Sequence, residues 1–244
     1  MTILNNSLIW CYLIVEFHYS LFYNKNMYFE NRRVAGDILA DQLFDEYRWE
    51  DCAIIALNSG GVLVAEPIAE KLHSVLTMLL SEEITIPSED LVLGEISQNG
   101  NFVKNRNLSD GQFNEYSREL FNVFEQLKRE KIQKINRLIG DGGTISLDLL
   151  RGRNIIVVSD GFIDSSTIDV VLDFIKPIEY RRIIAASPVA SIKAVDRLHV
   201  SADEIHILDV KNNYLDTNHY YDDNNVPPLK DVINKISNIV LNWK

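Results

Sequence analysis

The chain has 244 residues, 46% hydrophobic and 24% charged, which suits a globular protein with one sizeable α/β domain. Asp and Glu outnumber Lys and Arg by 35 to 24, giving a net charge of −11, so the chain repels phosphate polymers and no nucleic-acid polymer is expected as a partner. Its two cysteines, Cys11 and Cys52, are too few for a disulfide framework and favour a reducing, cytoplasmic location.

The N-terminus differs from the rest of the chain. Residues 7–23 are strongly apolar and aromatic, but a membrane-spanning helix needs about 20 apolar residues without charges. This run is shorter and carries Glu16 and His18 near its middle, so a membrane association is not favoured. We expect residues 1–26 to be an apolar extension and residues 27–244 to form the domain. A marginal membrane anchor and an added strand or helix are the alternatives.

The first half of the domain is predicted to alternate helices and buried strands. The expected elements, in chain order, are a helix over 31–47, a strand over 52–57, a helix over about 62–73, a strand over 74–80, a polar loop containing Pro87, a strand near 91–96 and a hairpin or loop over 97–107. Asn99-Gly100 is the turn signal in the last of these.

The second half begins with a long helix, expected over about 110–139. Ser109 and Gln112 form a capping-box pattern at its start, and three glycines between 140 and 143 end it. The elements expected after it are a strand over 154–159, a helix ending before Pro177, a strand over 182–187, a helix from Pro188 to about His199, a strand over 204–209, a polar segment over 210–228 and a helix over about 229–242.

This order predicts the fold class. Strands that alternate with helices imply right-handed crossovers and a mostly parallel sheet. We therefore expect an α/β fold with a mostly parallel, twisted sheet, helices on both faces, and an insertion that contains the long helix. The sequence has no internal repeat and no interior linker, so a single domain follows.

Two turns lie where strands end and helices begin, at 58–61 (NSGG) and 160–167 (DGFIDSST). In an open parallel sheet, ligands bind outside the carboxyl ends of the strands. Free N–H groups and the helix dipole at a helix start favour an anion. Each turn alone is more often only a connector, whereas the two at one edge predict a ligand with two phosphate groups.

The residues of these turns suit such a ligand. Gly60 and Gly61 allow a close approach of the backbone and a positive φ. A cap and hydroxyl donors are supplied in the second turn by Asp164, Ser165, Ser166 and Thr167.

The chain resembles the type I phosphoribosyltransferases, in particular a group of predicted, poorly characterised bacterial and archaeal members. The resemblance covers about Tyr28 to Tyr221 and is carried by the order and spacing of several stretches. These are residues 31–43 (NRRVAGDILADQL), 55–72 (IALNSGGVLVAEPIAEKL), 91–96 (LVLGEI), 152–168 (GRNIIVVSDGFIDSSTI), 183–198 (IIAASPVASIKAVDRL) and 220–223 (YYDD).

This resemblance implies an activity and its cofactor. Such enzymes use phosphoribosyl pyrophosphate with Mg²⁺, and a nitrogen nucleophile, usually a nucleobase, displaces pyrophosphate. Catalysis is then mostly positioning and electrostatic stabilisation of an oxocarbenium-like state. The implied partner is a phosphorylated sugar or nucleotide, and a homodimer is left open.

The resemblance also implies a role for each turn. Ser59, Gly60 and Gly61 would face the pyrophosphate. Asp160 would accept hydrogen bonds from the ribose hydroxyls, and it is the expected catalytic residue and metal ligand. The 5′-phosphate would be wrapped by the turn 164–167, which consists of Asp164, Ser165, Ser166 and Thr167. Gly161 is a further expected substrate-binding residue. Residues 97–150 would form a hood and a mobile loop over the site.

Several positions depart from the family pattern. Ser159 stands where the family has a second acid, and Asn58-Ser59 stands where it has Pro-Arg. Glu82-Glu83 replaces an Arg-Lys pair, Asp164 a Thr, and Ser165 a Gly. Losing cations and gaining carboxylates weakens a partly buried anion site by roughly several kcal/mol.

These departures leave three hypotheses open. The first is an active phosphoribosyltransferase with an unusual site, and the second is a non-catalytic regulatory or nucleotide-binding protein on the same fold. The third is a different chemistry, such as hydrolysis with Asp160 and Asp164 as metal-bound carboxylates. The sequence shows no Ser–His–Asp or zinc signature. Among the scattered histidines, His206 alternates with Ile205 and Ile207 and is expected to point out of a strand face.

Overall fold

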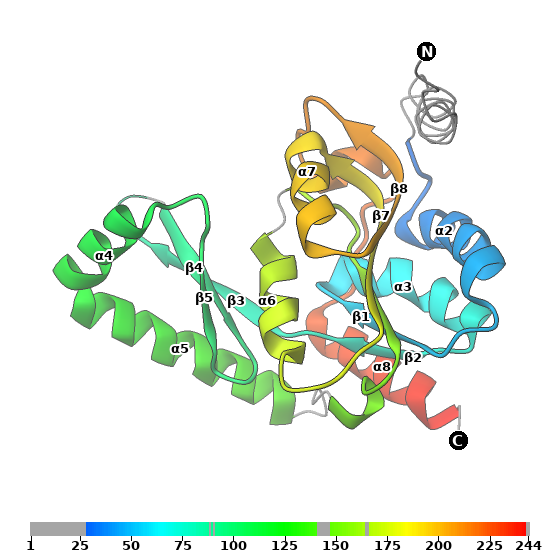
Figure 1. The fold of residues 1–244 in the computed structure, drawn as a ribbon, viewed down its shortest axis with the longest axis horizontal. Coiled ribbons are helices and arrows are strands. Elements are labelled where there is room, and N and C mark those ends of the chain that lie inside the picture. Colours follow the sequence, from blue (N-terminus) through cyan, green and yellow to red (C-terminus); the bar gives the residue numbers. More distant parts are fainter. Residues whose placement is uncertain (1–27, 88, 90, 141–146, 164–165, 243–244) are drawn as a thin grey trace, which may run out of the picture.

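The computed structural model describes residues 28–87, 89, 91–140, 147–163 and 166–242. Its main body is a five-stranded parallel sheet in the order β2-β1-β6-β7-β8 (Figure 1). The strands are β1 (Cys52–Ala56), β2 (Val75–Met78), β6 (Asn154–Val158), β7 (Arg182–Ser191) and β8 (Glu204–Lys211). The predicted α/β fold with a mostly parallel sheet is confirmed.

Helices cover both faces of this sheet because alternate strand residues point to opposite sides. Ile54 and Ala56 belong to one core cluster, and Ala53 and Ile55 belong to the other. The first cluster contains buried residues of α2 (Arg32–Tyr47), α3 (Ser59–Leu72) and α8 (Leu229–Asn242), and the second those of α6 (Ser166–Ile175) and α7 (Ile192–Ser201). Two short 3₁₀ helices, Leu147–Leu149 and Thr217–Tyr220, complete the main body.

A second lobe is inserted between β2 and β6 and projects beside α6 (Figure 1). It consists of an antiparallel sheet, β3 (Ser81–Ile86), β4 (Leu91–Ser97) and β5 (Phe102–Lys104), with α4 (Asp110–Glu119) and α5 (Phe121–Gly140). Three phenylalanine rings hold the helices to the sheet, with Phe102 lying 5.8 Å from Phe113 and 5.2 Å from Phe124 between ring centroids.

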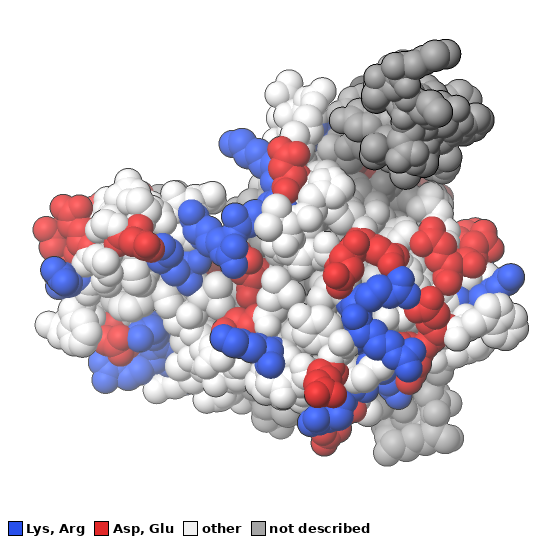
Figure 2. All heavy atoms as spheres, viewed as in Figure 1, with Lys and Arg blue, Asp and Glu red and all other residues white. Residues whose placement is uncertain are grey.

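Charges of both signs lie side by side on the face of the molecule shown in Figure 2. This face therefore has no uniformly basic surface. In the part of the chain that the structure describes, no helix has the length and apolarity needed to cross a membrane. Residues 1–26 lie outside that part, so their assignment as an extension stays a prediction.

Most elements lie where the sequence predicts them, with three corrections. The segment 81–90 contains strand β3 rather than only a polar loop, because Ile84 and Ile86 alternate with polar residues and pack into the core. The long helix is two helices, since the backbone leaves helical geometry at Leu120 (φ −108°, ψ 25°). The capping box of Ser109 and Gln112 is confirmed.

The third correction concerns Pro188, which does not start a helix. Strand β7 continues through it to Ser191, which caps α7 by accepting a hydrogen bond from Ala194 N. The hydroxyl of Ser187 donates to the carbonyl of Val189 across the proline, at 2.9 Å. Because both β8 and the turn after β6 pair with this extension, the strand rather than the proline decides where the helix begins.

Helices α2 and α3 pack closely through Gly36, which gives a test of the core. A Cβ at Gly36 would lie 2.4 Å from the Val64 carbonyl oxygen, a backbone atom. We expect Gly36→Ala to lower the free energy of unfolding by about 1–3 kcal/mol in urea denaturation, despite the helix propensity of Ala, worth about 1 kcal/mol. In Gly111→Ala, the control in α4, the nearest atom to the added Cβ is 3.9 Å away. Equal losses in the two variants would contradict the close packing.

Candidate functional site

The two predicted turns meet at the point where the order of the strands reverses. From β1 the chain crosses to β2 on one side, and from β6 it crosses to β7 on the other. Since β1 and β6 are parallel neighbours, with Ala56 paired to Val158, their turns leave the same edge of the sheet. In open α/β sheets this switch point is where ligands bind.

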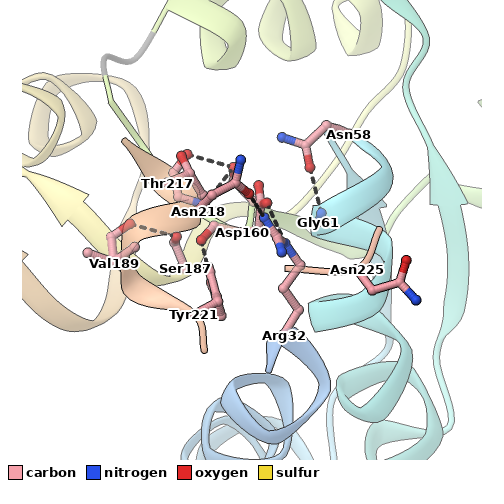
Figure 3. Close-up of polar contacts among 12 residues, drawn as sticks. Arg32, Asn58, Gly61, Asp160, Ser187, Val189, Thr217, Asn218, Tyr221 and Asn225 are labelled. Atoms are coloured by element: carbon pink, nitrogen blue, oxygen red, sulfur yellow. Dashed lines mark hydrogen bonds and ion pairs between the residues drawn. The ribbon is translucent and has the colours of Figure 1, made fainter. Parts of the chain in front are cut away.

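The first turn is the N-terminal turn of α3. The side chain of Asn58 caps the helix by accepting a hydrogen bond from Gly61 N at 2.5 Å (Figure 3). The N–H groups of Ser59 and Gly60 have no intrahelical partner at this position of a helix. They are the two donors that the first turn can offer to an anion.

The glycines of this turn are required by close approach. A Cβ at Gly60 would lie 2.0 Å from Oδ2 of Asp160, and one at Gly61 would lie 2.9 Å from the Val158 carbonyl oxygen. Among the described glycines, a positive φ occurs at Gly100 and Gly152. The positive φ predicted for Gly60 and Gly61 is therefore wrong. The contact of Gly60 with Asp160 joins the two predicted turns directly.

The second turn is described in part. Asp164 and Ser165 lie outside the described residues, and α6 begins at Ser166. Thr167 lies half-buried in the first helical turn. The role of the residues 164–167 in wrapping a phosphate therefore stays a prediction.

Asp160 is held by a buried ion pair with Arg32, the first residue of α2. The Nε of Arg32 donates to Oδ2 of Asp160 at 2.8 Å, and the two side chains are only 3% and 8% exposed. Arg32 also donates from Nη2 to Oδ1 of Asn218 at 2.6 Å (Figure 3). Its remaining terminal nitrogen, Nη1, is buried and has no hydrogen-bond partner among the described residues.

Tyr221 completes this network from the C-terminal part of the domain. Its ring lies under the Arg32 guanidinium, 4.5 Å from the centroid to Cζ, and its hydroxyl donates to the Asp160 carbonyl oxygen at 2.5 Å. Burial, and then the negative charge of Asp160, raise the pKa of Tyr221. The hydroxyl thus stays protonated and remains a donor at neutral pH.

The residues on both sides of Asp160 are also fixed by short-range contacts. The hydroxyl of Ser159 donates to the Gly161 carbonyl oxygen at 3.0 Å and accepts from Gly161 N at 3.2 Å. A Cβ at Gly161 would lie 2.2 Å from the hydroxyl oxygen of Tyr214. The position that holds a second acid in the resembling family is therefore part of a closed turn, with Tyr214 packed against it.

Mg²⁺ is usually held by one or two carboxylates together with water and substrate phosphates. The described part of the turn offers one carboxylate, that of Asp160, and the Arg32 guanidinium already holds it. Asp160 as a metal ligand stays a prediction, and it requires the Arg32 pair to open.

A cavity of about 190 Å³ lies beside the first turn. Its lining is mainly apolar and consists of Leu57, Asn58, Ser59, Met78, Leu79, Leu80, Ser81, Glu82, Ile135, Leu138 and Leu229. Glu82 accepts hydrogen bonds from Lys131 at 3.1 Å and Lys134 at 2.5 Å, both on α5. Burial acts to raise the pKa of Glu82, but these lysines outweigh it and lower the pKa, so the carboxylate stays charged.

Sequence reasoning missed the cation at this site. Arg32 lies in the stretch 31–43, which the resemblance includes, but it is 128 residues from Asp160 in the chain. Its spacing therefore gives no signal of the pair. Tyr221 lies at the end of the resemblance, and its contact with Asp160 could not be foreseen either.

A solved structure shares the overall fold of this chain. No family model matches the chain. The crystal structure of the protein TT1426 from Thermus thermophilus is similar, with a TM-score of 0.66 and 25% sequence identity over 89% of this chain and 99% of that one.

Phosphoribosyltransferases are also among the structural neighbours. A purine phosphoribosyltransferase from Pyrococcus horikoshii has a TM-score of 0.43 at 13% identity, covering 78% of this chain and 91% of that one. A hypoxanthine-guanine phosphoribosyltransferase from Bacillus anthracis has 0.41 at 12%, covering 74% and 79%.

The buried pair makes a sharp prediction about stability. Arg32→Met leaves the Asp160 carboxylate buried without its partner, so we expect the free energy of unfolding to fall by about 3–5 kcal/mol. The double variant Arg32→Met/Asp160→Asn should lose less than the sum of the single losses. Urea denaturation measures both.

The neighbouring Arg33 provides the control. Its side chain is 49% exposed and pairs with Glu66 and Glu70 at 3.0 Å, so Arg33→Met should cost no more than about 1 kcal/mol. A loss in Arg32→Met as small as that in Arg33→Met would mean that the pair does not organise the site.

Proposed function

We propose that this protein binds a phosphorylated sugar or nucleotide, such as phosphoribosyl pyrophosphate, where β1 and β6 end. The observation that carries the proposal is the contact of the two turns at the switch point, with Gly60 packed against Asp160. The starts of α3 and α6 then offer N–H groups to anionic groups of one ligand. The resemblance to the type I phosphoribosyltransferases supports the same choice of ligand.

We further propose that binding occurs without phosphoribosyl transfer, so that the role is regulatory. The Asp160 carboxylate, which transfer would use, is neutralised by Arg32, and Ser159 replaces the second acid. The space beside the first turn, where the resemblance expects pyrophosphate, is mainly apolar, and the charge of Glu82 in its lining is paired with Lys131 and Lys134. An apolar lining offers few hydrogen-bond donors to a pyrophosphate group.

Transfer to a nitrogen acceptor such as a nucleobase is the second candidate. The position of Asp160 favours it, because this carboxylate lies between the two turns, within reach of a sugar bound across them. Transfer would require Arg32 to release Asp160. A hydrolytic reaction has less support, because Asp164, its second carboxylate, lies outside the described residues.

Calorimetry with ribose 5-phosphate, a nucleoside monophosphate and phosphoribosyl pyrophosphate, with and without Mg²⁺, tests the binding. We expect saturable, micromolar binding of at least one of them. Thr167→Val should weaken it by about 10-fold or more, because a hydrogen bond to a charged group contributes about 1.5–3 kcal/mol. Thr85→Val, a half-buried threonine of β3, is the control. If the two variants bound the ligand with equal affinity, the phosphate would not lie at the start of α6. If none of the three ligands bound, the proposed function would be wrong.

A second experiment asks whether the missing cation can be restored. Ser59→Arg adds a guanidinium at the first turn and should raise the affinity for phosphoribosyl pyrophosphate by about 10-fold, whereas Ser59→Gln should not. Pyrophosphate release in a screen of nucleobases should stay at background in the unmodified protein. Measurable turnover there would establish the second candidate. No gain in Ser59→Arg would mean that the first turn does not face the ligand.

A further inference from the structure

A second cluster of functional groups lies at the opposite edge of the sheet. Glu46 is next to the last residue of α2, and Glu204 and His206 are in the first half of β8. Oε2 of Glu46 is 3.6 Å from Nε2 of His206, and Oε2 of Glu204 is 4.0 Å from the same nitrogen. All three atoms lie within 4.8 Å of one another.

This spacing matches the geometry of a metal ion. Zn²⁺ binds imidazole nitrogen and carboxylate oxygen at about 2.0–2.2 Å with tetrahedral angles, which places neighbouring ligand atoms about 3.4 Å apart. The separations of 3.6 and 4.0 Å from His206 Nε2 exceed this value by about 0.2 and 0.6 Å, and all three ligand atoms lie within 4.8 Å of one another. Small rotations of the glutamate side chains would close the difference.

Direct hydrogen bonding does not explain the approach of Glu46 to His206. A separation of 3.6 Å is too long for a hydrogen bond. The His206 side chain is 13% exposed, so its ring lies mostly inside the protein.

The surroundings orient these groups. Arg182 donates hydrogen bonds to Oε1 of Glu204 and to Glu50, so its positive charge is shared between two carboxylates. The other oxygen of Glu204, Oε2, is on the side of His206. Tyr47 donates its hydroxyl to the same Oε2 and lies 3.2 Å from His206 Nε2. A metal ion bound by these two atoms would therefore displace the Tyr47 hydroxyl from between them. The C-terminal end of α2 adds the negative end of a helix dipole.

We propose that Glu46, Glu204 and His206 bind one divalent transition-metal ion, with Zn²⁺ as the best fit. One imidazole and two carboxylates suit Zn²⁺, and the exposed side of Glu46 leaves room for water as a further ligand. The ion would join the end of α2 to β8. This site is distinct from the candidate phosphate site, because α2 has 16 residues and separates Glu46 from Arg32 by roughly 20 Å.

Calorimetric titration of the metal-free full chain with ZnCl₂ tests this proposal. We expect one ion per chain at this site, with the affinity reduced at least 10-fold in Glu46→Gln and in His206→Ala. Glu46→Gln is the decisive variant, because its side chain is 55% exposed and the substitution leaves the core intact. Zinc should also raise the thermal unfolding midpoint of the unmodified protein and not that of Glu46→Gln.

Two control variants match these changes. Asp45→Asn removes the same charge from the adjacent exposed position of α2, and His219→Ala removes an exposed histidine elsewhere. Both should keep the affinity of the unmodified protein. The proposal is overturned when the unmodified protein binds no zinc, when the controls lose as much as the variants, or when Glu46→Gln/His206→Ala retains full affinity.

Discussion

The buried ion pair between Arg32 and Asp160 is the interaction on which the candidate site depends. It joins the start of α2 to the turn after β6, and the contacts of Arg32 with Asn218 and Tyr221 add the C-terminal part of the domain. A buried pair of this kind contributes little net stability, because desolvation offsets most of the attraction. Its effect is to fix geometry, since neither partner can be left buried alone. Three distant segments are thereby held at one point of the sheet edge.

The same pair limits the chemistry that the site can perform. A carboxylate that accepts from a guanidinium is a weaker acceptor for sugar hydroxyls and a poorer metal ligand than a free one. A phosphate that entered near Arg32 would compete with Asp160 for the guanidinium and would release the carboxylate. If the proposed ligand bound in this way, its binding and the availability of Asp160 would be linked through Arg32. This linkage is compatible with a protein that senses a phosphorylated ligand.

Local signals make most of the fold predictable from the sequence. The buried strands, the capping box at Ser109 and the turn at Asn99-Gly100 each depend on neighbouring residues, and they lie at the expected places. Strand β3 is missed because its two glutamates conceal the alternation of Ile84 and Ile86, and the effect of Pro188 is misjudged because pairing with β8 overrides a helix-start signal. The contact of Gly60 with Asp160 is implied by topology. The partner of Asp160 is not, because nothing in a sequence identifies which distant arginine enters a turn.

Helix α2 connects these observations, since one end carries Arg32 and the other carries Glu46 and Tyr47. The helix packs closely on α3 at Gly36, where the backbones leave no room for a methyl group, so it behaves as a rigid element rather than as two independent ends. An ion that fixed Glu46 to β8 would restrict how far the helix can shift. If the release of Asp160 by Arg32 requires the start of α2 to move, an ion bound at the far end of the helix would favour the closed pair. The rigidity of a single helix would then couple the two proposed sites.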